Sequence, residues 1–313
     1  MAKIALVFPG QGTQHTGMGS SLFKEFATVR DVFHRASSVL GIDMCRLCFE
    51  GSQKDLDLTV NTQIAVLTLN IAIYSVFKEK TAINPVVIAG HSLGEYCALY
   101  AAGAIDFDDV FQLVHARALY HQEAVSPGEG AMAAIIGMDD NAVESICAEI
   151  NNAQTQVAVA IYNAPAQVVV SGHTSAVEKV MQLAKQKGAM KTVLLPISVP
   201  CHCSLLQGAA GRFAENLAKI EFTNFITPVI PNCNPDIFYT KENARELLLG
   251  QIVSPVKWRQ TVEKMGALGV ETIIEIGPKR TLCGLIKRIN KNIQLYSIED
   301  VASLNKTAGI LAQ

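Results

Sequence analysis

The sequence has little charge of either sign. Only 17% of its 313 residues are charged, and 26 Lys and Arg residues nearly balance 28 Asp and Glu residues, for a formal net charge of −2. A chain without a basic excess gives no reason to expect a nucleic-acid partner. Hydrophobic residues make up 50% of the chain, so it can bury a sizeable core and does not have the composition of a disordered protein.

Long apolar runs are also missing. We find no run of the roughly 18 apolar residues that a membrane-spanning helix needs. The apolar start at 4–8 is short, ends at Pro9 and Gly10, and is not followed by a cleavage site of small residues. It is typical of a buried first strand and not of a signal peptide. We therefore expect a cytoplasmic protein with no membrane segment.

The eight cysteines are expected to be free thiols, because disulfides rarely persist in a cytoplasmic chain. The pair at Cys45 and Cys48 has no second pair at zinc spacing, which favours a structural role. Cys201, His202 and Cys203 are adjacent, and neighbours in an extended stretch point to opposite sides. The sequence therefore predicts no metal site.

The length of the chain predicts one large domain and one smaller domain. Strand and helix patterns alternate in the segments 1–127 and 199–313, which predicts a large α/β domain with a mostly parallel sheet and helices on both faces. Its strands are expected at 4–8, 85–89 and 272–276, and its helices at 95–102, 108–123 and 281–289.

The segment 128–198 has a different pattern. We expect the order strand, helix, two strands, helix and strand, which is the ferredoxin-like arrangement. The turn between the two middle strands is expected at 163–165. We interpret 128–198 as a small domain inserted into the larger one. Its strands are expected at 131–136, 157–161, 168–170 and 192–195, and its helices at 139–151 and 174–188.

The segment from Gly90 to Gly94 fits the pattern G-x-S-x-G between an apolar strand and a helix. A sharp strand-to-helix turn lifts the hydroxyl of Ser92 clear of the sheet, and the two glycines avoid clashes in so tight a bend. Free N–H groups at the start of the helix face a developing oxyanion. The alternative is an ordinary turn with a chance serine, but the flanking strand and helix favour a nucleophile.

A serine hydroxyl needs a base, and spacing leaves two histidines open. His91 adjoins Ser92 but is constrained by the turn, whereas His202 lies where the chain leaves the small domain, beside an expected cleft. A structural histidine is the alternative for either. Gln11 lies in the glycine-rich turn after the first strand, at the same sheet edge as Ser92. Backbone N–H groups from both turns could form an oxyanion hole, unless Gln11 is only a solvated turn residue.

Arg117 lies on the apolar row of the helix expected at 108–123, which predicts that it is at least partly buried. A buried guanidinium cannot lose its proton and needs an anion. A carboxylate such as Glu95 or Glu123 is one candidate partner. A substrate carboxylate held by two hydrogen bonds is the other.

Motifs in one order along the whole chain carry a resemblance to a known family. The sequence resembles malonyl-CoA:acyl carrier protein transacylases of bacterial fatty acid synthesis and the acyltransferase domains of polyketide synthases. So many ordered matches are more specific than any single motif. The matching segments are 7–12, 61–63, 90–95, Arg117, 130–134, 162–165, 199–202, Gln251 with 255–258, and 275–278.

The resemblance implies an α/β-hydrolase-like core with a ferredoxin-like insert, and it implies roles for single residues. Ser92 is acylated, His202 is the general base, and the backbone carbonyl of Gln251 orients His202. Arg117 pairs with the malonyl carboxylate. Gln11 and Leu93 supply the oxyanion-hole N–H groups, and Gln63, Met132 and Asn163 belong to the substrate cleft.

The resemblance also implies an activity. A malonyl group would pass from malonyl-CoA to the phosphopantetheine thiol of acyl carrier protein by a ping-pong mechanism, for fatty acid biosynthesis, with no metal or redox cofactor. A polyketide pathway stays open. A serine thioesterase or hydrolase is the second hypothesis, because it shares the turn at Ser92 but needs no carboxylate clamp. A non-catalytic carrier-binding module is disfavoured by the presence of Ser92 and His202. We expect a monomer.

Carrier proteins of this kind are typically acidic, so the resemblance implies a basic docking patch. Solvated surface lysines are the alternative for any single residue. The candidates are Lys279, Arg280, Lys287, Arg288 and Lys291, and also Lys185, Lys187 and Lys191.

Two positions depart from the family pattern. Cys201 stands where the family often has serine or phenylalanine before the catalytic histidine, and Ile64 stands where it often has proline. Neither change removes a catalytic group. Excluding one extra methyl group is worth only about 1–3 kcal/mol, so a small residue at 201 leaves the choice between malonyl and methylmalonyl open.

Overall fold

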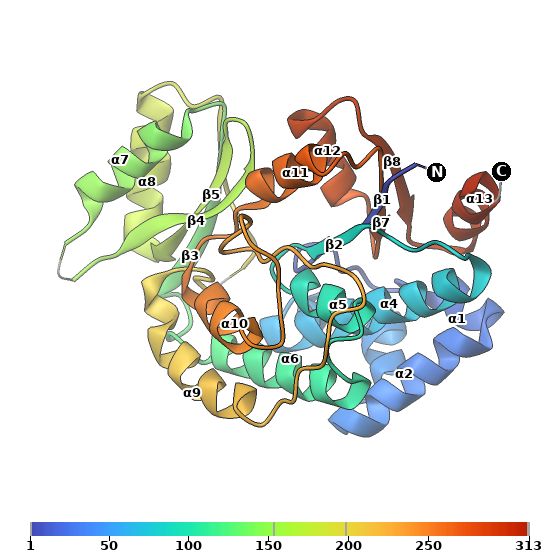
Figure 1. Ribbon diagram of the computed structural model, residues 1–313. Helices are drawn as coiled ribbons and strands as arrows, with labels where there is room; N and C mark the ends of the chain where they lie inside the picture. Colours follow the sequence, from blue (N-terminus) through green and yellow to red (C-terminus); the bar gives the residue numbers. More distant parts are fainter. Residues whose placement is uncertain (1, 153, 198, 312–313) are drawn as a thin grey trace.

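The computed structural model describes residues 2–152, 154–197 and 199–311, which form two sheets with helices around them (Figure 1). The larger sheet is parallel and has the strand order β2-β1-β7-β8, which confirms the expected α/β core. The strands are β1 Ile4–Phe8, β2 Val87–Gly90, β7 Thr272–Ile276 and β8 Gln294–Ile298. The sequence pattern did not predict β8, whose side chains are mostly half-exposed at the sheet edge.

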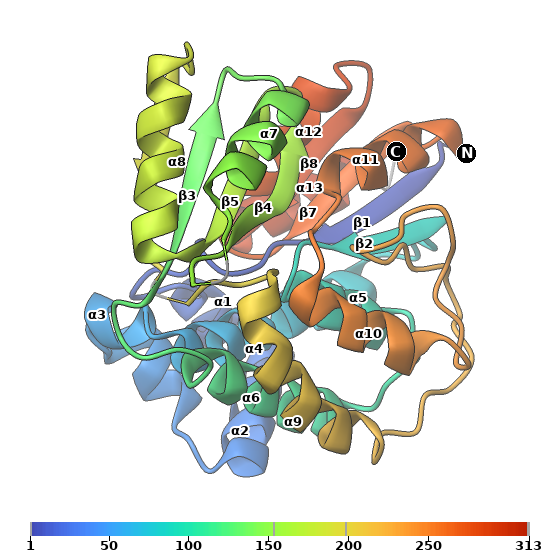
Figure 2. The ribbon, with the colours of Figure 1, turned by 90° about the vertical axis from the view of Figure 1, so that its left-hand side faces the viewer.

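Side chains of β1 alternate between two apolar layers. Leu6 and Phe8 belong to the core on the side of α4 and α5, whereas Ala5 and Val7 belong to the core on the side of α11 and α12, as the period of two in a strand requires. Helices therefore cover both faces of the sheet (Figures 1 and 2). The helices of this part are α1 Ser20–Glu25, α2 Ala27–Leu40, α3 Gln53–Leu56, α4 Thr59–Lys80, α5 Gly94–Ala101, α6 Phe107–Gln122, α9 Gln207–Leu217, α10 Ala244–Val253, α11 Trp258–Ala267, α12 Thr281–Ile289 and α13 Val301–Leu311, with a π-helical turn at Arg46–Glu50 and a 3₁₀ turn at Ser204–Leu206.

The second sheet lies wholly within the segment 128–198. It is antiparallel with the strand order β4-β5-β3-β6, and α7 and α8 cover the face turned away from the larger sheet (Figure 1). The element order is the expected one. The exact domain boundaries stay a prediction, and Ser198 lies outside the described residues. The elements are β3 Gly130–Ile136, α7 Asp140–Ile150, β4 Val157–Ala164, β5 Gln167–His173, α8 Thr174–Gln186 and β6 Lys191–Leu194.

One expected turn is displaced. Asn163 lies inside β4, which continues through Ala164, and the reversal falls at Pro165 and Ala166, where Ala166 has φ 55°. The strand is irregular between Tyr162 and Ala164, and the N–H of Tyr162 donates to the carbonyl of Val256 in the neighbouring layer. This contact holds the end of β4 against the larger domain and brings Asn163 toward the sharp turn at Gly90–Gly94, which we call the elbow.

Helix α4 corrects the expectation about apolar segments. By length and composition it is long and apolar enough to cross a membrane, but 78% of its most apolar window is buried inside the protein. It packs against α2, α5 and α6. This burial is typical of the central helix of a core.

Close packing around the turn between β2 and α5 gives a stability prediction. A Cβ atom on Gly94 would lie 2.0 Å from the carbonyl oxygen of Phe8 in β1, a backbone group that cannot move aside. We expect Gly94→Ala to lower the free energy of unfolding by about 3 kcal/mol, measured by urea denaturation. Gly211→Ala on α9 is the control, because a Cβ there meets nothing within 4 Å, and it should be neutral or stabilising by up to about 1 kcal/mol. Equal effects of the two changes would contradict the prediction.

Candidate active site

Ser92 follows β2 with a backbone φ of 52°, a left-handed conformation that non-glycine residues rarely adopt. The glycines on either side make this bend possible. A Cβ on Gly90 would lie 1.9 Å from the backbone of Gly94, and one on Gly10 would lie 2.4 Å from the carbonyl oxygen of His91. The sharp turn predicted at Ser92 is therefore present, and the Gly10 turn packs directly against it.

The structure brings Ser92, His202 and Gln251 together. Ser92 Oγ lies 2.7 Å from His202 Nε2, and His202 Nδ1 lies 2.8 Å from the backbone oxygen of Gln251 in α10. A carbonyl oxygen only accepts, so Nδ1 carries the proton and Nε2 presents its lone pair to the serine hydroxyl. His91 is occupied elsewhere, because its Nε2 lies 3.0 Å from Asn163 Oδ1. Of the two histidines left open by the sequence, His202 is the one placed as a base.

The surroundings of His202 keep its imidazole neutral. Burial lowers its pKa to about 3, and the positive charge of Arg117 acts in the same direction. The hydrogen bond to the Gln251 carbonyl opposes this shift. A negative charge placed on Arg117 would offset the effect of the arginine charge and make His202 a stronger base.

Arg117 is buried with only 1% of its surface exposed, as its helix position predicts. Its Nη1 donates to Gln63 Oε1 at 2.6 Å, and its Nη2 donates to Gln251 Oε1 at 3.1 Å and to Ser92 Oγ at 3.3 Å. Its Nε has no hydrogen-bond partner among the described residues. The guanidinium therefore adjoins the nucleophile and still has an N–H donor, on Nε, that is not used within the described residues.

Neither carboxylate considered as a partner for Arg117 forms an ion pair with it. Glu123 pairs with Arg212 at 2.8 Å, and Glu95 receives its hydrogen bonds from other groups. No carboxylate of the described residues lies within ion-pair distance of Arg117. A buried cation with only neutral partners is a ready binding site for an anionic ligand group.

Gln11 lies beside Ser92 as the sheet topology predicts, because the Gly10 turn packs against the elbow. A Cβ on Gly10 would lie 3.4 Å from the backbone nitrogen of Leu93. Within the described part of the chain, neither the Gln11 N–H nor the Leu93 N–H donates a hydrogen bond. The Gln11 side chain donates to Thr59 at 3.2 Å. These two N–H groups, in turns that pack against each other, are thus free to bind an oxyanion.

The two cleft residues from the small domain differ in their placement. Asn163 is bonded to His91 and so reaches the elbow directly. Met132 is buried in the apolar layer between the sheets, together with Cys201 and Val199. The structure gives it no polar contact with Ser92 or Arg117, and its role in the cleft stays a prediction.

Comparison with known proteins shows the family of the chain. Residues 5–307 match the profile of the acyl transferase domain. The chain belongs to the acyl transferase family. Two relatives, both named malonyl CoA-acyl carrier protein transacylase, are each 40% identical. The Bacillus subtilis protein aligns over 96% of this chain and 94% of its own length, and the Escherichia coli K12 protein over 97% and 98%.

Solved structures of acyl transferases match the fold. An acyl carrier protein S-malonyltransferase from Vibrio cholerae is 43% identical with a TM-score of 0.94, covering 98% of this chain and all of the other. A malonyl-transacylase solved with a type II polyketide synthase acyl carrier protein is 40% identical with a TM-score of 0.96, covering 99% of this chain and all of the other. The large α/β core with a small domain is thus the fold of this family.

Sequence reasoning missed the role of Asn232 in the active site. This residue lies in the loop before α10, and its side chain is buried. Its Oδ1 accepts from the N–H of Ser92 at 2.7 Å, and its Nδ2 donates to the carbonyl of Gly90 at 2.6 Å. The side-chain amide therefore clamps both ends of the bend. Nothing in the sequence around Asn232 marks it, because its partner is 140 residues away.

The segment around His202 is not extended, which corrects the reason given above against a metal site. His202 has φ 62° and lies in a turn. The three side chains still diverge: His202 faces Ser92, Cys201 packs in the apolar layer, and Cys203 Sγ lies 3.2 Å from the carbonyl of Pro200. All eight cysteines are free thiols.

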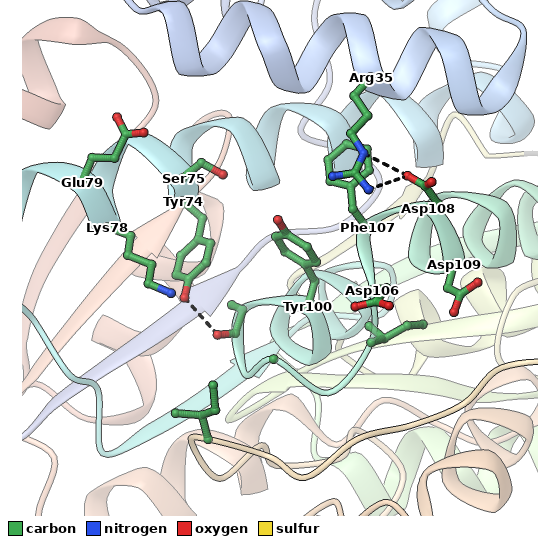
Figure 3. A pocket seen from close by; sticks show the side chains of 14 residues that line it. Arg35, Tyr74, Ser75, Lys78, Glu79, Tyr100, Asp106, Phe107, Asp108 and Asp109 are labelled. Carbon is green, nitrogen blue, oxygen red and sulfur yellow. Dashed lines mark hydrogen bonds and ion pairs between the residues drawn. The ribbon is translucent and has the colours of Figure 1, made fainter.

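A cavity of about 800 Å³ lies at the C-terminal end of α5, whereas Ser92 precedes its N-terminal end. Figure 3 shows its lining. Two pairs of its polar groups are bonded to each other: Arg35 pairs with Asp108 at 2.9 Å, and the hydroxyl of Tyr74 donates to the carbonyl of Ala101 at 2.9 Å. None of the residues assigned to acyl transfer lines it, so we place no part of the reaction there.

Proposed function

We propose that this acyl transferase moves a malonyl group from malonyl-CoA to the phosphopantetheine thiol of an acyl carrier protein through a malonyl-Ser92 ester. The observation that carries the proposal is the buried Arg117, which adjoins the Ser92 hydroxyl and lacks a carboxylate partner in the described chain. A malonyl thioester supplies such a carboxylate. The name of the two 40% identical relatives, malonyl CoA-acyl carrier protein transacylase, supports the same substrates.

In the first half-reaction, His202 Nε2 takes the Ser92 proton as Oγ attacks the thioester carbonyl carbon. The N–H groups of Gln11 and Leu93 donate to the resulting oxyanion, a stabilisation worth about 10²- to 10³-fold per donor. The carbon–sulfur bond then breaks, the proton on His202 passes to the coenzyme A sulfur, and malonyl-Ser92 remains.

The second half-reaction reverses these steps with a different thiol. The phosphopantetheine thiol gives its proton to His202 and attacks the ester carbonyl, and the returning proton releases Ser92. Bond and proton changes balance with these side chains alone, so the proposed reaction needs no metal or redox cofactor. Arg117 holds the malonyl carboxylate throughout, with Gln63 and Gln251 supporting its guanidinium.

Intact-mass spectrometry tests the proposal. Incubation with malonyl-CoA should add the mass of one malonyl group to the protein, and acetyl-CoA should add little. The adduct should disappear when acyl carrier protein bearing phosphopantetheine is added, with malonyl-carrier formed, and it should persist with carrier protein that lacks the arm. Release of the adduct as free malonate at the same rate with and without the arm would indicate a hydrolase instead.

Carrier docking is proposed on the basic residues of α12 and of the segments that flank it. We call this set the α12 group, and its members are Lys279, Arg280, Lys287, Arg288 and Lys291. Lys287 and Lys291 line a hollow of about 510 Å³, and the nearby Lys279 Nζ lies 3.4 Å from the carbonyl of Gly12, beside the Gln11 turn. The second group of basic candidates lies on α8 and β6 of the small domain, where Lys187 pairs with Glu149. We favour the α12 group because it adjoins a turn of the active site.

Charge reversal tests this docking surface. The double change of Lys287 and Lys291 to glutamate should raise KM for the carrier protein by about tenfold or more, because exposed charges at the edge of an interface set the rate of association. The difference from the wild type should shrink as the salt concentration rises, because salt screens such charges. Adduct formation from malonyl-CoA should not change. Reversal of Lys185, in the last turn of α8, and of Lys187, which directly follows this helix, is the control. The α12 assignment would be wrong if the α8 change raised KM more.

We further propose that the reaction serves fatty acid biosynthesis, in the cytoplasm and by a monomer. The eight free thiols support a reducing compartment. A polyketide carrier presents the same thiol, and one structural relative was solved with such a carrier. Comparing kcat/KM for a fatty acid carrier protein with kcat/KM for a polyketide carrier protein would distinguish the two pathways, and we expect the fatty acid carrier to give the higher value.

A further inference from the structure

The Glu95 carboxylate joins the parts of the active site although it is not among the residues assigned to the reaction. It is fully buried near the start of α5. Its Oε1 accepts from the N–H of Asn232 at 3.0 Å and from the hydroxyl of Tyr239 at 2.6 Å, and its Oε2 accepts from the side-chain amide of Gln251. We call Glu95, Asn232, Tyr239 and Gln251 the Glu95 network.

One arm of the Glu95 network reaches the nucleophile. Asn232, held through its backbone N–H by Glu95, uses its side chain to bind the N–H of Ser92 and the carbonyl of Gly90. This clamp supports the strained φ of Ser92. It also engages the Ser92 N–H, so that Leu93 and not Ser92 is left to supply an oxyanion donor from the elbow.

A second arm reaches both the base and the carboxylate-binding arginine. Gln251 Nε2 faces two acceptors, Glu95 and the carbonyl of Ser92, so it must be the donor end of the amide. Gln251 Oε1 is thereby turned toward Arg117 Nη2. The backbone carbonyl of the same Gln251 binds His202. Glu95, the Ser92 carbonyl and Arg117 together therefore fix which way the amide points.

Glu95 also balances the charge of Arg117 without blocking it. The two side chains are linked through Gln251 and form no direct ion pair. A direct pair would occupy the donors that a substrate carboxylate needs. With the Gln251 side chain between the two charges, the Glu95 carboxylate lowers the free-energy cost of burying the guanidinium. The guanidinium stays available to a substrate carboxylate.

We propose that Glu95, in its carboxylate form, is a positioning residue that holds Ser92, His202 and Arg117 in their reactive arrangement. Protonation would put a proton on a carboxylate that three donors face, and so weaken its hold on Asn232, Tyr239 and the Gln251 amide. This inference deepens the proposed function and rests on it, because its readout is malonyl transfer.

The state of Glu95 changes within the working pH range. Burial raises its pKa to about 7, against the opposing effects of its three hydrogen bonds and of Arg117. The ionisable groups that face it are Arg117 from α6, Tyr96 from α5, and Cys233 and Tyr239 from the loop before α10. His202, with a pKa near 3, does not titrate there. We therefore expect kcat/KM for malonyl-CoA to fall as the pH drops through about 7.

The test is the pH profile of Glu95→Gln, a change of nearly equal size that removes the charge. We expect kcat/KM at pH 8 to fall by about 10- to 100-fold, as for loss of a group that orients a catalytic residue, and the decline near pH 7 to disappear. The control is Glu275→Gln. Glu275 is also a fully buried carboxylate with a raised pKa, but it accepts from the N–H groups of Leu282 and Cys283, outside the Glu95 network. It should keep the wild-type profile.

A milder variant keeps the proposal testable if Glu95→Gln does not fold. Tyr239→Phe removes one hydrogen bond that lowers the pKa of Glu95, so the decline in rate should move to higher pH by about one unit. A purely structural role would lower the unfolding temperature without moving the profile. The proposal is overturned if Glu95→Gln keeps the decline near pH 7, or if Tyr239→Phe leaves it in place.

The two failures can be told apart. If the wild-type protein transfers no malonyl group at any pH, the proposed function is wrong. If it transfers malonyl groups but the profile does not respond to the Glu95 and Tyr239 variants, only the role of Glu95 is wrong.

Discussion

Replacing Ser92 with alanine is expected to abolish the malonyl adduct and to reduce transfer to the carrier protein by about 10⁴-fold or more. The variant keeps the elbow, because alanine has the size of serine without Oγ and Asn232 still binds the backbone N–H. The lost hydroxyl lies 2.7 Å from His202 Nε2. Intact mass after mixing with malonyl-CoA measures the first effect, and a carrier-protein assay measures the second.

Ser75→Ala is the matched control, because Ser75 lies on α4 beside the cavity of Figure 3 and its hydroxyl bonds only its own helix. It should keep both adduct and transfer. A malonyl adduct that survives in Ser92→Ala would show that another side chain is acylated, and the role assigned to Ser92 would then be wrong.

The parts of this site that the sequence predicted are local in the chain. Glycines that must sit two residues either side of Ser92 leave a recognisable pattern, and the apolar row of α6 marks Arg117 as a buried cation. The ferredoxin-like segment is readable for the same reason, since each of its strands and helices has its own period. Ordered family motifs favoured His202, which spacing alone left open, and added Gln251, which spacing did not indicate.

The parts that were missed depend on contacts between distant segments. Asn232 and Tyr239 come from an irregular loop, where no periodicity shows which side chain is buried. Glu95 was considered only as a partner for Arg117, because a sequence does not show that an amide such as Gln251 stands between two charges. The placement of Asn163 in a turn failed for a related reason: contact with Val256 extends β4 beyond its apolar stretch.

Arg117→Ala is the second large expected effect, and it should act on one substrate and not on the other. Loss of the hydrogen bonds to the malonyl carboxylate, each worth about 1.5–3 kcal/mol for a charged acceptor, should lower kcat/KM for malonyl-CoA by about 10²- to 10³-fold. Acetyl-CoA has no carboxylate to lose, so its kcat/KM should hold or rise. The ratio of the two constants is the measurement. Arg35→Ala is the control, since Arg35 pairs with Asp108 at the distant cavity.

The pH dependence of the Arg117→Ala enzyme separates a carboxylate clamp from a general loss of structure. Arg117 lowers the pKa of both His202 and Glu95, so its removal should raise both. Because each group acts in its deprotonated form, the fall of kcat/KM on the acid side should begin at a higher pH than in the wild type, with acetyl-CoA as the substrate. A profile that stays in place while malonyl and acetyl transfer fall together would mean that Arg117 stabilises the fold and does not select the acyl group.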